Sequence, residues 1–408
     1  MQTNTHPTDP LNLILNGRRP PFVPVAPSYE SLGPLEFHRV ALRWSKWRDR
    51  LDAAGTDRLP VEYQAYFDLE LEIHTDILDT CYPPPAWLIL PTISTPPEVA
   101  GATVERRGDD LYWVDADGDA AWLPPSRQAY HTRMADERSG PYARLWSAGH
   151  NGGDLEEAAA RARREARPAP DPSPDEMAAE RDSGRYHLAR ALLSRYPNNL
   201  PLYSSYEAPY ISLLWLLGFQ RMMSALVDSP DLVHQVLEGW VPRPSAALLA
   251  QRSLGIGIMF VEECLASADI ISPGMYQEFS FPYTKQMLQF YEDLGFRTVL
   301  YFSGNLMPLL HHLKQLPFTA IIFEEDRKNY GIDLAEVRRV MGPDRVLFGN
   351  VDAHFLEKAS DDEVLAEVRR QIGLAGSDGN FVVSVGSPFT PDTSLDRVRL
   401  FCQSTQVI

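Results

Sequence analysis

Carboxyl and hydroxyl side chains gather directly after several apolar, β-rich runs of this chain. Parallel strands bring the residues that follow them to one edge of a sheet, so these positions are the first candidates for chemistry. They are Ser28 and Tyr29, Tyr206 and Glu207, Glu262, Glu263 and Cys264, Tyr301, Ser303 and Asn305, Glu324, Glu325 and Asp326, Asn350 and Asp352, and Ser387. Oxygen-rich groups of this kind can bind a metal ion, or donate a proton where burial raises the pKa of a carboxyl.

Basic residues do not occupy these positions; the nearest, Arg327, stands one residue after the run that ends at Asp326. The whole chain of 408 residues is acidic, with 38 Lys and Arg against 55 Asp and Glu and a formal charge of −17. Such a protein repels polyanions, which excludes nucleic acid and anionic membrane surfaces as partners. We expect a small-molecule substrate.

Each of these groups also has a structural interpretation. Acids after a strand often cap the next helix or pair with its basic residues, and Glu324, Glu325 and Asp326 fit that role. Cys264 follows two acids, which raise the pKa of a thiol, so we interpret it as a buried structural cysteine. The candidate catalytic residues are Glu262, Glu263, Tyr301, Ser303, Glu325 and Ser387, and the candidate substrate-binding residues are Ser28, Tyr29, Tyr206, Glu207, Asn305, Glu324 and Asp352.

Eight apolar runs bounded by turn residues predict the strands that position these groups. They span 21–27, 86–91, 200–206, 255–263, 296–302, 318–325, 345–350 and 381–386. Amphipathic helical patterns lie between the later runs, and several begin at Ser or Asp and end at Gly, as helix caps require. Eight strands alternating with helices predict an α/β fold, a (β/α)8 TIM barrel formed by residues 1–408 as one domain. A doubly wound open sheet would give the same alternation.

Two excursions interrupt the N-terminal half of the pattern. Residues 102–124 alternate about a DADG turn, which predicts a β-hairpin insertion. Residues 125–196 combine a charged helical pattern at 154–167 with a proline-rich run at 167–176, which predicts a helical, polar, Pro-rich insertion. This second insertion could serve as a lid over the strand ends. A flexible linker between two domains is the alternative.

The cysteines and the apolar runs indicate where the protein works. Three cysteines, Cys81, Cys264 and Cys402, are too few for a disulfide framework. The best apolar run, 211–219, is less than half of the roughly 20 residues that span a bilayer. The start of the sequence does not resemble a secretion signal. We therefore expect a cytoplasmic protein.

Several segments resemble the uroporphyrinogen decarboxylase superfamily. They are LNGRRPPFVPVAPSYE near the N-terminus, LGFQRMMSALVDSPDLVHQVL at 217–237, ISPGMYQEFSFPYTKQML at 271–288, SGNLMPLL at 303–310, GNVD at 349–352 and GSPFTPDTSLDRVRLF at 386–401. The resemblance runs from about residue 12 to the end and is weakest over 102–196. It implies a distorted (β/α)8 barrel and makes a homodimer the expected assembly.

The resemblance also implies one of two chemistries. One branch of the superfamily removes carboxylates from the acetate groups of uroporphyrinogen without a cofactor. The other moves methyl groups between corrinoid cofactors and acceptors such as coenzyme M, with zinc held by a His-x-Cys pair and a later Cys. In this sequence those positions read Tyr301, Ser303 and Ser387. Their hydroxyl groups stay protonated at neutral pH and bind zinc poorly, so we expect no zinc–thiolate site and no metal.

The decarboxylase branch also fits only in part. Its arginine-containing segment for substrate carboxylates corresponds here to VAPSYES at 25–31. We therefore expect an enzyme of the methyltransferase branch that uses acid–base chemistry, with no tightly bound cofactor, a methyl-corrinoid as co-substrate and a corrinoid protein as partner. The alternatives are a metal-independent decarboxylase or other lyase for a carboxylated substrate, and a non-catalytic barrel subunit.

Overall fold

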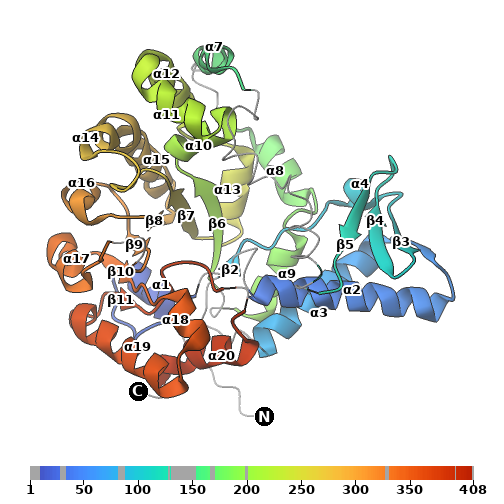
Figure 1. The fold of residues 1–408 in the computed structure, drawn as a ribbon. Helices are drawn as coiled ribbons and strands as arrows, with labels where there is room; N and C mark the ends of the chain where they lie inside the picture. Colours follow the sequence, from blue (N-terminus) through green and yellow to red (C-terminus); the bar gives the residue numbers. More distant parts are fainter. Residues whose placement is uncertain are drawn as a thin grey trace.

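A parallel β-sheet lies at the centre of the molecule (Figure 1). The computed structural model describes residues 10–27, 34–80, 88–126, 129, 153–165, 171–197, 201–326, 330–390 and 392–406. Within them the sheet has seven strands in the order β11-β10-β9-β8-β7-β6-β2. The strands are β2 (Leu88–Ile89), β6 (Leu202–Glu207), β7 (Ile258–Glu263), β8 (Arg297–Phe302), β9 (Ala320–Phe323), β10 (Val346–Phe348) and β11 (Phe381–Val382).

The first predicted strand joins the other edge of this sheet. Val25 forms a parallel bridge with Val383, directly after β11, and Val351 forms another with Val385. All eight predicted runs therefore lie side by side in chain order, as a (β/α)8 barrel requires. The described residues contain no pairing between Val25 and β2, so closure of the ring stays a prediction.

The strands separate two hydrophobic cores, because successive side chains point to opposite faces of a sheet. On β7, Ile258 and Phe260 belong to the interior core, whereas Met259 and Val261 belong to the outer core beneath the helices. The interior core consists of Leu11, Ile14, Leu15, Ala26, Tyr203, Ile258, Phe260, Val299, Tyr301, Ala320, Ile322, Val346, Phe348 and Val382.

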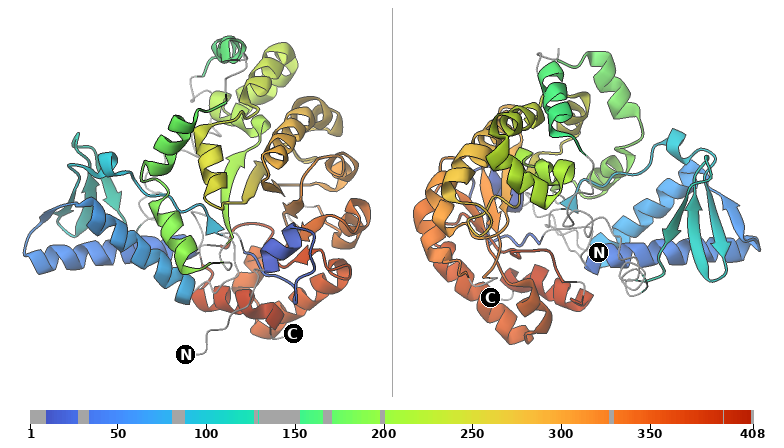
Figure 2. Two further views of the ribbon diagram at one scale, coloured as in Figure 1. Left: turned by 180° about the vertical axis from the view of Figure 1, so that it is seen from behind. Right: turned by 45° about the horizontal axis from the view of Figure 1, so that its top comes forward.

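Helices cover the outer face of the sheet (Figures 1 and 2). They are α10 (Pro209–Leu217), α11 (Phe219–Asp228), α12 (Pro230–Trp240), α13 (Ala246–Ser253), α14 (Pro273–Met275), the π-helical turn η1 (Tyr276–Ser280), α15 (Phe281–Asp293), the 3-10 turn η2 (Met307–Leu309), α16 (Leu310–Leu313), α17 (Leu334–Met341), α18 (Ala353–Lys358), α19 (Asp361–Ala375), α20 (Leu395–Gln403) and the 3-10 turn η3 (Ser404–Gln406). The cap signals in the sequence are used: Asp333 accepts hydrogen bonds from the first turn of α17, and Ser360 forms a reciprocal capping box with Glu363 at α19.

The predicted hairpin is part of an arm that projects from the side of the strand array (Figure 2). Here α2 (Pro34–Ala54) and α3 (Tyr63–Thr80) pack beside an antiparallel sheet, β1-β3-β4-β5. Its strands are β1 (Arg58–Pro60), β3 (Thr103–Arg107), β4 (Asp110–Val114) and β5 (Ala120–Leu123), with the short helix α4 (Pro96–Val99) before β3. The strands β4 and β5 pair across the DADG turn as predicted, and β1 and β3 extend that hairpin.

The described part of the second excursion is helical, as predicted. It forms α7 (Leu155–Glu165), α8 (Pro174–Asp182) and α9 (His187–Arg195), which contact α12, α13 and α3 respectively. Residues 127–128, 130–152 and 166–170 lie outside the described residues, so the lid remains an expectation. No single helix in the described segments is long and apolar enough to cross a membrane; α10 and α11 meet those criteria only together, across a bend of 114°.

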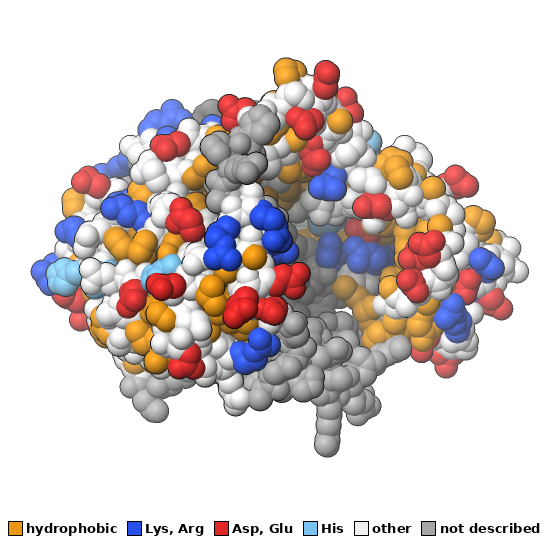
Figure 3. Space-filling model, turned by 90° about the horizontal axis from the view of Figure 1, so that it is seen from above, with side chains coloured by type: hydrophobic (Ala, Val, Ile, Leu, Met, Phe, Trp, Pro, Cys, Tyr) orange, Lys and Arg blue, Asp and Glu red, His pale blue; other side chains and the backbone are white. Residues whose placement is uncertain are grey.

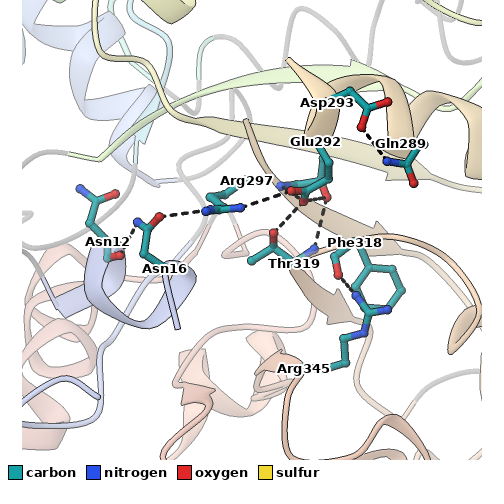
Figure 4. A network of polar contacts seen from close by, with 10 residues as sticks. Asn12, Asn16, Gln289, Glu292, Asp293, Arg297, Phe318, Thr319 and Arg345 are labelled. Atoms are coloured by element: carbon teal, nitrogen blue, oxygen red, sulfur yellow. Dashed lines mark hydrogen bonds and ion pairs between the residues drawn. The ribbon is translucent and has the colours of Figure 1, made fainter. Parts of the chain in front are cut away.

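The helix α1 (Pro10–Leu15) closes the end of the sheet at which the strands begin. Leu11 and Ile14 insert into the interior core, and Asn16 accepts a hydrogen bond of 3.1 Å from Arg297 Nε at the start of β8 (Figure 4). A cavity of about 630 Å³ lies at this end, beside Glu292 and Arg345. Glu292 accepts hydrogen bonds from Thr298 and Thr319, so the network ties α15 to two strands. This face of a barrel contributes to stability more than to chemistry.

Leu11→Ala tests this closing role. Leu11 is fully buried, so the substitution removes apolar contacts and leaves a cavity, and we expect the free energy of unfolding to fall by about 2–5 kcal/mol in chemical denaturation. Val227→Ala is the control, because Val227 is 73% exposed and should give a change within about 0.5 kcal/mol. Equal stability of the two variants would contradict the role of α1.

Candidate active site

A polar layer lies at the carboxyl ends of the strands, directly above a column of aromatic rings. Inside the array, Tyr203, Phe260 and Tyr301 follow one another on neighbouring strands, with ring centroids 5.3 and 5.8 Å apart. One step further along β6 and β7, Ser205 donates a hydrogen bond of 2.9 Å to Glu262. The alternation of side chains thus carries the interior from aromatic packing to polar chemistry within two residues.

Two carboxyls stand side by side in this layer. Glu207 and Glu262 are register partners on β6 and β7, and both are half-buried. Burial raises the pKa of the Glu262 carboxyl, although the Ser205 hydroxyl opposes the shift. The pKa of Glu207 is also raised, first by burial and then by the charge of Glu262, while a hydrogen bond from Trp215 lowers it. Such a pair resists holding two negative charges at once.

Glu324 has a different environment, just after β9. Its carboxylate accepts hydrogen bonds from the Ser303 hydroxyl at 3.1 Å, the Gly304 amide at 3.1 Å and the Tyr330 hydroxyl at 3.0 Å. Asn350 donates a further hydrogen bond to the Glu324 backbone carbonyl at 3.3 Å. Glu262 and Glu324 are two strand spacings apart, about 10 Å at the backbone, which leaves room for a small substrate.

The acids after Glu324 point elsewhere. Glu325 is buried, and its carboxylate accepts a 2.8 Å hydrogen bond from the Ser387 hydroxyl. Gly386 makes this packing possible, because a Cβ there would lie 2.3 Å from the Glu325 Oε2 atom. Glu325 also lines a separate cavity of about 330 Å³ together with Asp326 and Asp352.

Three predicted positions have clear local roles instead. Asp352 caps α18 by accepting a hydrogen bond from the His354 amide at 2.8 Å, and Asn305 accepts one from the Met307 amide at 3.1 Å. Asp326 accepts one from the Ile332 amide at 2.6 Å, so the structural interpretation of that acid is confirmed. Cys264 packs against the interior core and is partly buried.

Glu263 and Tyr206 lie on the helix side of the sheet, away from the polar layer. Glu263 accepts a hydrogen bond from Ser280 in the π-helical turn η1, and burial raises its pKa to about 7. The Tyr206 ring lies 5.9 Å from the Tyr291 ring of α15. Ser28 and Tyr29 fall outside the described residues. Of the predicted set, the structure brings together Glu207, Glu262, Tyr301, Ser303 and Glu324.

Sequence reasoning missed three residues that belong to this site. Ser205 could have been found by extending the alternation from Tyr203. Trp215, in α10, and Tyr330, in the loop after β9, reach Glu207 and Glu324 through tertiary packing, for which the sequence has no local signal.

The three positions that correspond to zinc ligands in the methyltransferase branch do not suit zinc here. Tyr301 is buried against Phe260, Ser303 donates to Glu324, and Ser387 donates to Glu325. These hydroxyls already serve different partners, and protonated hydroxyls are weak zinc ligands. Among the described residues no group of three or more His, Cys, Asp and Glu side chains could hold a metal ion.

Comparisons with known proteins place this fold and site in a class. Residues 163–407 match the model of the uroporphyrinogen decarboxylase (URO-D) family, and the chain belongs to that family. It is 22% identical over 219 residues to a methylated-thiol–coenzyme M methyltransferase of Methanosarcina mazei, covering 53% of this chain and 56% of the relative. It is 26% identical over 199 residues to a uroporphyrinogen decarboxylase of Xanthomonas campestris, covering 47% of this chain and 54% of the relative. The chain thus spans about half the length of the curated relatives that it matches.

A solved structure agrees with the fold. A methyltransferase from Methanosarcina mazei superimposes with a TM-score of 0.57 at 17% identity, covering 97% of each chain. At this identity the likeness shows the fold alone. The relatives are enzymes of both chemistries that the sequence suggested.

Glu263 predicts a pH-dependent stability. Its pKa is about 7 in the folded chain and near the ordinary 4.5 when unfolded, so the folded state binds the proton more tightly. This contribution is complete below pH 4.5, falls by roughly 1.4 kcal/mol per pH unit as pH rises, and levels off above pH 7. Denaturation of Glu263→Gln across this range should show a flatter profile than the parent. Glu278→Gln, at an exposed position of the same turn, should keep the parent profile. A parent profile in Glu263→Gln would contradict the assignment.

Elemental mass spectrometry of the purified, untagged chain tests the zinc argument. We expect substoichiometric zinc, and the same melting temperature with and without a chelator, because the three corresponding side chains are engaged hydroxyls. One tightly held zinc per chain would show that other ligands form a site and would return thiol chemistry to consideration.

Proposed function

We propose that this chain is a methyl-transferring enzyme that works by acid–base chemistry without a zinc–thiolate centre. The arrangement of Glu262 and Glu324 supports the proposal most. Glu262 has a raised pKa inside the strand array, and Glu324 accepts hydrogen bonds from three donors. Two carboxyls whose surroundings differ in this way suit the acid and base roles of one reaction.

The roles follow from these surroundings. As the methyl group leaves its donor atom, the bonding electron pair stays on that atom and Glu262 protonates it. The acceptor atom forms the new bond to carbon and passes its proton towards Glu324. Ser303 and Tyr330 hold Glu324 in place, and Tyr301 forms the floor beside Glu262. A methyl-corrinoid, carried by a corrinoid protein, would serve as co-substrate on one side of this exchange, as the resemblance implies.

Decarboxylation is the second candidate, favoured by the likeness to a uroporphyrinogen decarboxylase. In that reaction Glu262 would protonate the carbanion that remains after carbon dioxide leaves. The lining of acids argues against a highly anionic substrate, because Glu207, Glu262 and Glu324 would repel it. A substrate with few carboxylates would suit this site better.

Selection by charge must act locally in either case. Acidic and basic side chains are interspersed over the described part of the surface in Figure 3, so this side of the molecule has no patch of a single sign large enough to steer a ligand from afar. The carboxyl pair inside the strand array then supplies the selective charge.

Product analysis separates the two candidates. The full chain is incubated with methylcobalamin and a panel of thiols, amines and alcohols, and in parallel with carboxylated substrates. A methylated product with no carbon dioxide supports methyl transfer, whereas carbon dioxide without methyl transfer replaces it with a carboxy-lyase. Release of neither product would favour a non-catalytic subunit.

Glu262→Gln tests the acid itself. Glutamine keeps the size and the contact with Ser205 but cannot donate the proton, so we expect turnover to fall by about 10²-fold or more. The parent activity should fall as pH rises through the raised pKa of Glu262, and the variant should lose that limb of the profile. Glu72→Gln, at an exposed position on α3, is the control for a neutralised surface acid. Turnover within a factor of two of the parent would remove Glu262 from the mechanism.

A further inference from the structure

The tryptophan beside the carboxyl pair is an unusual feature of the candidate active site. Trp215 is 39% exposed, one of the few large apolar side chains in the described residues that water reaches. Its indole N–H donates to Glu207, which fixes the edge of the ring next to the carboxyls. An exposed indole held in this way presents a π face close to negative charge.

The charges around Glu207 are one-sided. Glu262 is the other charged group that the described residues place against it, and the Trp215 indole is its neutral partner. No Lys, Arg or His side chain among the described residues contributes to the surroundings of either carboxyl. A carboxyl pair without a counter-charge, next to an aromatic face, lacks one component: a cation.

The kind of cation follows from the same groups. A metal ion would need a larger set of oxygen, nitrogen or sulfur ligands than this corner offers. An organic ammonium ion is larger and less strongly hydrated, and it gains both from carboxylates and from the face of an indole. We infer that the substrate of this site carries an ammonium-type cation, bound between the Trp215 ring and the Glu207 and Glu262 carboxyls. This inference rests on the proposed function for the position of the reaction, but its test needs no turnover.

The test compares a cation with its neutral isostere. Choline and 3,3-dimethylbutan-1-ol have the same shape and differ in one charge, and titration calorimetry measures the binding of each to the full chain. We expect choline to bind roughly tenfold or more tightly. Its affinity should rise with pH, because ionisation of Glu207 and Glu262 supplies the attraction, whereas the binding of the alcohol should not change. Equal affinities would overturn the inference.

Variants separate a cation site from a simple apolar surface. Glu207→Gln and Trp215→Leu should each weaken choline binding and leave the binding of the alcohol nearly unchanged, and Trp215→Phe should restore part of the affinity. Trp122→Leu is the matched control, because Trp122 also donates to an acid, Asp110, at 3.0 Å, but in the arm. Equal losses for both ligands in the Trp215 variants would mean that the ring offers only apolar contact, and would overturn the inference. Choline discrimination in a protein that transfers no methyl group would leave the binding inference standing and refute the proposed function.

Discussion

The opposite orientation of neighbouring side chains on a strand determines the organisation of this site. Glu262 and Glu263 are adjacent in the sequence, yet one lies inside the strand array and the other beneath the helices. Ser205 and Glu207 face Glu262 because β6 and β7 are in parallel register, so one slip of a strand by a single residue would dismantle the carboxyl pair. The interior aromatic column and the helix α1 hold that register from within the array.

The polar layer is built from pairs of carboxyls and hydroxyls. Ser205 donates to Glu262, Ser303 to Glu324, Ser387 to Glu325 and Ser280 to Glu263. A serine partner satisfies one carboxyl oxygen without adding a positive charge, so the acidity of each group depends on its burial and on its other neighbours. This explains how Glu262 and Glu324 can differ although they lie on almost adjacent strands.

The sequence was sufficient for the strands and insufficient for the site. The eight apolar runs correspond to the eight strand positions because alternation and turn residues are local signals. Counting residues after each strand also found Glu207, Glu262, Ser303 and Glu324. The same counting could not separate Glu263 and Tyr206 from this group, since the face that a strand turns inward is decided by its neighbours. Trp215 and Tyr330 reach the site from a helix and a loop, which is information that only packing supplies.

The serines at two of the corresponding zinc positions have a consequence for the whole chemistry. A thiolate site would carry negative sulfur atoms and a metal at this corner, whereas here Ser303 and Ser387 orient Glu324 and Glu325. Polar groups that satisfy buried carboxylates are not easily replaced by apolar ones, because each loss would leave an acceptor unpaired at a cost of roughly 1–3 kcal/mol. The retained hydroxyls are therefore better explained by carboxylates that must be held in position than by the decay of an unused metal site. A barrel that keeps its acids oriented in this way is arranged to move protons.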